Sequence, residues 1–93
     1  MVTIQLRNYT ETVVNQVVNE LIARSEGVCK CEKCRFDIMA MALNNLNPQY
    51  YVSQKGEVFS KLLANYVETR NRVIKEVTKA SIAVNKNPHH EAR

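Results

Sequence analysis

The chain has 93 residues, of which 45% are hydrophobic, and carries 13 Lys and Arg against 9 Asp and Glu. This length predicts one domain over residues 1–93 with a small core, flanked by flexible segments at about 1–7 and 86–93. The net charge of +4 favours an anionic partner but is too small to indicate DNA binding. We see neither a signal peptide nor a membrane span, and therefore expect a cytoplasmic protein.

A first helix is expected from about Thr10 to Ser25. Its apolar residues recur in pairs four positions apart, at Val13, Val14, Val17, Val18, Leu21 and Ile22. This spacing is typical of one broad apolar stripe on a helix. Asn8 or Thr10 can cap its start, and Gly27 follows its end. Since valine is a poor helix former, we expect this helix to depend on packing against the rest of the domain.

Two further helices are expected. The second runs from about Arg35 to Asn45, ends at Asn47-Pro48, and has a buried side formed by Phe36, Ile38, Met39, Ala42, Leu43 and Leu46. Residues 49–53 form a loop or a short strand. The third helix runs from about Gly56 to Asn85, and its apolar stripe comprises Val58, Phe59, Leu62, Leu63, Tyr66, Val67, Val73, Ile74 and Val77. The predicted fold class is therefore all-α, a three-helix domain with a long C-terminal helix.

The length of the third helix leads to a prediction about assembly. A helix of roughly 28 residues is about 40 Å long, whereas a domain of this size has a radius of gyration of roughly 12 Å. We therefore predict a homodimer in which a second copy covers the apolar stripe of this helix. The alternative is a break near Arg70 that folds the helix into a hairpin.

All three cysteines, Cys29, Cys31 and Cys34, lie in one C-x-C-x-x-C motif. They are close enough to share one tetrahedral ion, and an odd number cannot pair off within a chain. In a reducing compartment clustered thiols bind metal more often than they oxidise, and zinc is the default ion for thiolates. We predict a structural zinc that clips the loop between the first two helices. A thiol redox switch is the lesser alternative, because Lys30, Lys33 and Arg35 favour the thiolate form.

The segment from Cys29 to Tyr50 also carries a pattern beyond the cysteines: Asp37, Ala42-Leu43-Asn44, Leu46, Pro48 and Tyr50. With the C-x-C-x-x-C motif, this pattern resembles the late competence development protein ComFB family. The Ser53-x-x-Gly56 turn and the opening Asn8-x-x-Glu11-x-x-Val14 are also similar to that family. The resemblance implies a small all-α homodimer without catalytic activity. It further implies bacterial regulation, namely competence in some firmicutes and cyclic-dinucleotide reception in cyanobacterial relatives.

The fourth zinc ligand is sought among Glu26, Glu32, Asp37, a water molecule and the pair His89-His90. Some members of the family carry a cysteine after the long helix, shortly past a proline, and here the comparable place reads Pro88-His89-His90. Histidine is the natural nitrogen substitute for sulfur on zinc. We therefore predict that His89 or His90, from the same or the partner subunit, completes a Cys₃His site. The alternative is a tail with two solvated histidines.

No nucleophile–base pair and no convergent carboxylates are found in the sequence, so no enzyme is expected. We predict a non-enzymatic, zinc-binding, dimeric regulatory protein that acts through an unknown protein partner. The alternative function is a receptor for cyclic di-GMP or cyclic di-AMP. Guanidinium groups fork onto phosphate and stack on purines, and tyrosines add stacking. The candidate ligand-binding residues are Arg35, Tyr50, Lys55, Arg70 and Arg72. The alternative is that these cations simply form solvated faces of helices and bind no ligand.

Overall fold

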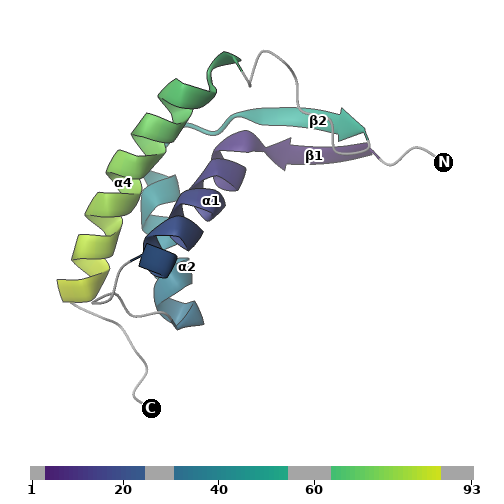
Figure 1. The fold of residues 1–93 in the computed structure, drawn as a ribbon. Coiled ribbons are helices and arrows are strands. Elements are labelled where there is room, and N and C mark those ends of the chain that lie inside the picture. The colour runs from purple at the N-terminus through teal and green to yellow at the C-terminus, as the bar shows by residue number, and fades with distance from the viewer. Residues whose placement is uncertain (1–3, 25–30, 55–63, 87–93) are drawn as a thin grey trace.

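The computed structural model describes residues 4–24, 31–54 and 64–86. The elements in chain order are β1 (Ile4–Asn8), α1 (Tyr9–Arg24), α2 (Glu32–Asn44), β2 (Tyr50–Gln54) and α4 (Tyr66–Lys86). The three helices pack against one another, and the two strands form an arm that extends from one end of the helices (Figure 1). The prediction of three helices is confirmed for the described residues, but the domain is mostly helical rather than all-α, because two strands pair in the arm.

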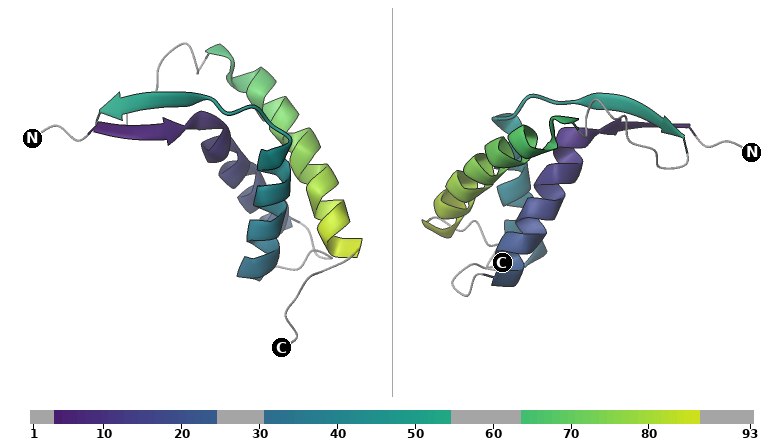
Figure 2. Two further views of the ribbon diagram at one scale, coloured as in Figure 1. Left: turned by 180° about the vertical axis from the view of Figure 1, so that it is seen from behind. Right: turned by 45° about the horizontal axis from the view of Figure 1, so that its top comes forward.

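The arm is a two-stranded antiparallel sheet in which Leu6 lies opposite Val52 and Asn8 lies opposite Tyr50. We expected a flexible segment up to about residue 7 and a loop or short strand at 49–53. Instead, both segments are strands that pair with each other, as Figure 2 shows from two further sides. Each strand has only five residues, so neither is stable alone, and the pairing partner is distant in sequence.

The core lies among the three helices and is made mostly of valine. Its buried members include Val13, Val14, Val17, Val18, Ile38, Ala42, Val73, Val77, Ala80 and Val84. The apolar stripe predicted for α1 therefore faces the core. Three of the described residues that we expected on apolar helix faces are exposed instead: Phe36 on α2 by 55%, and Val67 and Ile74 on α4 by 70 and 39%.

Polar contacts fix the arm to the helices at the start of α1. Asn8 caps α1, because its Oδ1 accepts the backbone N–H of Thr10 at 3.2 Å and that of Gln49 at 2.9 Å. The N–H of Tyr9 donates to the carbonyl of Gln49 at 2.7 Å. The rings of Tyr9 and Tyr51 meet edge to face, with centroids 6.4 Å apart. One face of the sheet is thereby packed on the helices.

The helix α4 begins at Tyr66, after a turn at Asn65. The start expected near Gly56 lies outside the described residues, but the helix is not continuous through Asn65. It runs unbroken past Arg70 to Lys86, so the alternative of a hairpin at Arg70 is wrong. Its 21 residues span about 32 Å, within the 46 Å long axis of the molecule. The length of α4 therefore does not by itself require a second copy.

Within residues 4–24, 31–54 and 64–86, no helix is both long and apolar enough to cross a bilayer.

Candidate functional site

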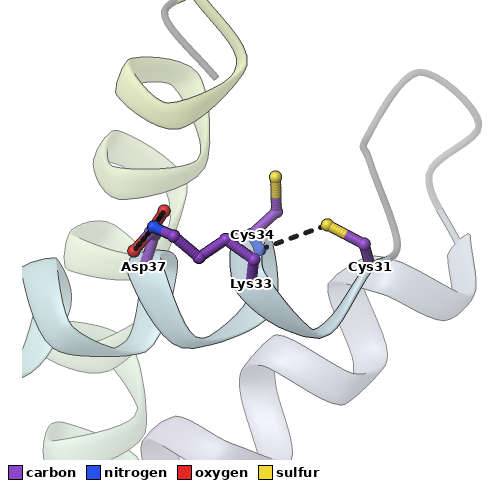
Figure 3. Close-up of polar contacts among 4 residues, drawn as sticks. All are labelled: Cys31, Lys33, Cys34 and Asp37. Carbon is purple, nitrogen blue, oxygen red and sulfur yellow. Dashed lines mark hydrogen bonds and ion pairs between the residues drawn. The ribbon is translucent and has the colours of Figure 1, made fainter. Parts of the chain in front are cut away.

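The helix α2 begins at Glu32, three residues before the start expected from the sequence. Cys34 therefore lies in its first turn, and Cys31 is its N-cap, with an extended backbone. The Sγ of Cys31 accepts the backbone N–H of Cys34 at 3.4 Å. Figure 3 shows both sulfur atoms on the same side of this first turn. Cys34 is only 1% exposed and Cys31 is half-buried.

This pair of cysteines fits a zinc site in its donor chemistry. The N–H···S hydrogen bond and the positive end of α2 both favour the thiolate, which is the form that binds metal. Cys29, His89 and His90 lie outside the described residues. Within residues 4–24, 31–54 and 64–86, no group of three metal-binding side chains is found. The zinc and its ligand set thus remain a prediction. Of the predicted ligands, the structure describes Cys31 and Cys34.

The end of α4 is placed favourably for the predicted histidine ligand. The helix ends at Lys86, at the same end of the helical body at which α2 begins (Figures 1 and 2). Pro88, His89 and His90 follow in the sequence. The last described residues of α4 therefore lead toward the cysteine end of the molecule.

The first turns of α2 also carry an ion pair. The Nζ of Lys33 donates to both carboxylate oxygens of Asp37, at 2.9 and 2.8 Å. In Figure 3 the side chain of Lys33 starts beside Cys34 and reaches along the helix to Asp37, so the two charged groups meet away from the two sulfur atoms. Asp37, which we considered as a fourth zinc ligand, is thus already bound by Lys33.

Arg35 joins α2 to α1 next to the cysteines. Its guanidinium group donates to the side-chain oxygens of Asn15 and Asn19, which lie one turn apart on α1. We expected Arg35 to bind a ligand, whereas in the structure it connects α2 to α1. This contact sets the position of the first turn of α2 on α1, and with it the positions of Cys31 and Cys34.

The other candidate ligand-binding residues do not gather at one place. Arg70 forms an ion pair with Glu20 of α1 at 2.5 Å, whereas Arg72 pairs with Glu68 on α4 itself. Residues two positions apart face different sides of a helix, so Arg70 and Arg72 cannot serve one small ligand together. Tyr50 lies in the arm, and Lys55 is outside the described residues.

The ion pair of Arg70 and Glu20 predicts a pH dependence of stability. The hydrogen bond from Arg70 lowers the pKa of Glu20 below its ordinary value of 4.5. This contribution to folding is therefore present above pH 4.5 and is lost as the pH falls through the lower pKa of the folded protein. We expect Glu20→Gln to reduce stability at neutral pH and to weaken its decline below pH 4.5, as measured by urea unfolding at several pH values. An unchanged pH profile would contradict the contact.

A hollow of about 440 Å³ lies between the end of α2 and the first turns of α4. Its lining includes Thr10, Asn45, Gln49, Thr69, Arg72 and Lys75. The Nε2 of Gln49 donates to the Oγ1 of Thr69 at 3.1 Å. Among the described residues Lys75 forms no ion pair, although Glu68 and Glu76 also line the hollow. Sequence analysis missed this feature, for which the run of amide side chains from Asn44 to Gln49 was the available signal.

Most of the chain matches the model of a known protein family. The model of the late competence development protein ComFB family matches residues 7–88. The chain belongs to the ComFB family. The match includes Cys29, Cys31 and Cys34 and the residues of the hollow, and it ends before His89. It confirms the resemblance that the segment from Cys29 to Tyr50 indicated.

A solved structure agrees with this membership of the ComFB family. The late competence protein ComFB from Bacillus subtilis is similar, with a TM-score of 0.68 and 19% sequence identity over 96% of this chain and 100% of that chain. At this identity the likeness shows the fold alone. No curated protein matches the chain.

Proposed function

We propose that this ComFB-family chain is a non-enzymatic, zinc-stabilised, dimeric regulator of late competence or a related bacterial signalling process. It acts in the cytoplasm by binding another protein. The observation that carries the proposal is the placement of Cys31 and Cys34 at the start of α2, in a chain that belongs to the family. The three surfaces that would change with metal binding are the start of α2, its junction with α1 and the end of α4.

In this proposal Cys29, Cys31 and Cys34 hold the zinc together with His89 or His90. The zinc supplies a cross-link, because structural zinc sites contribute folding free energy directly. Arg35 orients the first turn of α2 through Asn15 and Asn19, and so positions two of the thiolates. The small valine core is the reason that such a cross-link matters to this chain.

Native mass spectrometry of the protein, purified under reducing conditions in the presence of zinc, tests the proposal. We expect a dimer that carries two zinc ions. A protein that remains free of zinc, or one that is monomeric at micromolar concentration, would overturn the corresponding part of the proposal. Zinc content and mass are read from the same spectrum, so the two parts are judged separately.

The hollow between α2 and α4 supports a second candidate function, reception of cyclic di-GMP or cyclic di-AMP. Lys75 and Arg72 supply cations for phosphate, and Asn45 and Gln49 supply amides for the base edges. Calorimetric titration with each dinucleotide tests this candidate. Lys75→Ala should weaken binding at least about tenfold, a loss of about 1.4 kcal/mol, whereas Lys86→Ala at the far end of α4 should not. An absence of heat with both dinucleotides would exclude it.

A further inference from the structure

Two amide side chains in the hollow between α2 and α4 use their N–H groups inside the protein. Asn45 donates to the carbonyl of Met41 at 3.1 Å. The Nε2 of Gln49 donates to the hydroxyls of Thr10 and Thr69, at 3.4 and 3.1 Å. Among the residues that the structure describes, the Oδ1 of Asn45 and the Oε1 of Gln49 accept no hydrogen bond. Both amides therefore offer an oxygen, and not an N–H, to a ligand.

Glu76 adds a largely buried carboxylate to the same hollow. Its side chain is only 15% exposed, because Glu76 lies between Val73 and Val77 at the edge of the buried stripe of α4. In the described part of the chain it pairs with Lys79 at 3.4 Å, and the side chain of Lys79 is 62% exposed. Ion pairs with so exposed a partner are weak. The carboxylate of Glu76 therefore still favours a cation in the hollow.

The helix ends around the hollow favour positive charge as well. The helix α2 ends at Asn44, and the residues that follow it line the hollow, namely Asn45, Leu46 and Asn47. The carboxyl end of a helix is partially negative, and the last turn of α2 contains no basic residue to compensate it. The amino end of α4 is partially positive, but its first turn contains Glu68. Figure 2 shows α2 and α4 side by side where these ends meet.

We propose that this hollow binds the guanidinium group of an arginine side chain on the partner protein. The proposal rests on the proposed function, in which the chain acts by binding another protein, and it names the contact. A volume of about 440 Å³ is many times the roughly 30 Å³ of a water molecule, so the hollow suits an organic group better than a bare ion.

The arrangement of the acceptors favours arginine over lysine. The oxygens of Asn45, Gln49 and Glu76 come from three segments of the chain, the end of α2, the residue before β2 and the middle of α4. A guanidinium group spreads five N–H donors over one plane, whereas an ammonium group presents three from a single point. Arginine is also enriched among the residues that dominate the binding energy of protein interfaces.

The two cations that line the hollow do not remove this preference. Arg72 pairs with Glu68 on α4 itself, so its charge is already balanced. Lys75 is exposed, so water and salt screen its charge more than that of the largely buried Glu76. Lys75 also separates this proposal from the dinucleotide candidate. Its removal should strengthen the binding of an arginine side chain and weaken the binding of a phosphate.

Titration of the full zinc-loaded chain with short capped peptides, followed by two-dimensional NMR, tests the proposal. The probe carries one arginine between glycines, and the control peptides carry lysine or citrulline, the uncharged analogue of arginine, at the same place. We expect the arginine peptide to bind at least about tenfold more tightly than the citrulline peptide and about threefold more tightly than the lysine peptide. The backbone signals of Gln49 and Glu76 should shift. Tighter binding of free arginine than of the arginine peptide would overturn the assignment to a partner protein.

Variants of the chain locate the binding. Glu76→Gln keeps the size of the side chain and removes its charge, so it should weaken the arginine peptide at least about tenfold. The matched control is Glu20→Gln, which removes the same charge on α1, outside the hollow, and should leave the affinity unchanged. Lys75→Ala should strengthen binding about twofold. Circular dichroism of each variant should match that of the unaltered chain.

Three results would overturn the proposal: equal affinity for the arginine and citrulline peptides, no effect of Glu76→Gln, or an equal effect of Glu20→Gln. Equal affinity for the lysine peptide would overturn the choice of a guanidinium group. If a cyclic dinucleotide binds and the arginine peptide does not, the hollow belongs to the second candidate function. Zinc content and dimeric state are read separately by native mass spectrometry, so failure of this site is distinguishable from failure of the proposed function.

Discussion

The Cys31→Ser protein is expected to lose its zinc and to unfold at a lower temperature. Serine is a preferred N-cap, so its hydroxyl keeps the hydrogen bond to the N–H of Cys34, and the substitution removes only a metal ligand. Loss of a structural metal ligand costs on the order of 3 kcal/mol, which lowers the melting temperature by roughly 12–24 °C in a domain of this size. Differential scanning calorimetry with zinc analysis measures both effects.

Two comparisons separate the ligand role of Cys31 from its capping role. The unaltered chain in the presence of a strong chelator should melt close to Cys31→Ser. Cys31→Ala should melt lower still, because loss of an N-cap costs about 1 kcal/mol. If Cys31→Ser keeps its zinc and its melting temperature, the zinc site does not include this residue and the proposed role of the motif fails.

The sequence predicted α1 well because its signals are local. The stripe from Val13 to Ile22 has an unambiguous period, and the Asn8 cap lies directly before the helix. The arm could not be predicted in the same way, since the register of β1 with β2 depends on contacts such as Tyr9 with Tyr51 and Gln49. Local pattern therefore determined the helices, and tertiary contact determined the sheet.

The same distinction between local pattern and tertiary contact applies to the candidate site. Cys31 and Cys34 are neighbours in the sequence, so their spacing alone predicts a shared ligand. The hollow beside α4 is different, because Thr10, Asn45 and Lys75 come from three parts of the chain and meet only in the fold. Arg35 was predicted from its charge to bind an anionic ligand. In the structure its guanidinium group instead donates to two asparagines of α1 and so joins α2 to α1, which the sequence does not reveal.

The second large effect is expected at Ile38, which is fully buried between α2 and the other helices. Ile38→Ala should destabilise the chain by about 2–5 kcal/mol, because it removes apolar contacts and leaves a cavity in a small core. The matched control is Phe36→Ala, a larger truncation two residues earlier at a side chain that is 55% exposed. It should cost less than about 1 kcal/mol. Urea unfolding of both variants measures the difference.

This pair of variants also decides which face of α2 is docked. The sequence pattern placed Phe36 and Ile38 on one buried side, yet residues two positions apart on a helix face different directions. In the structure Ile38 and Ala42 point to the core, and the start of α2 is held to α1 by Arg35. A cost for Phe36→Ala equal to that for Ile38→Ala would mean that α2 is rotated about its axis. Such a rotation would also move Cys34, one turn before Ile38, out of the core and away from the predicted zinc.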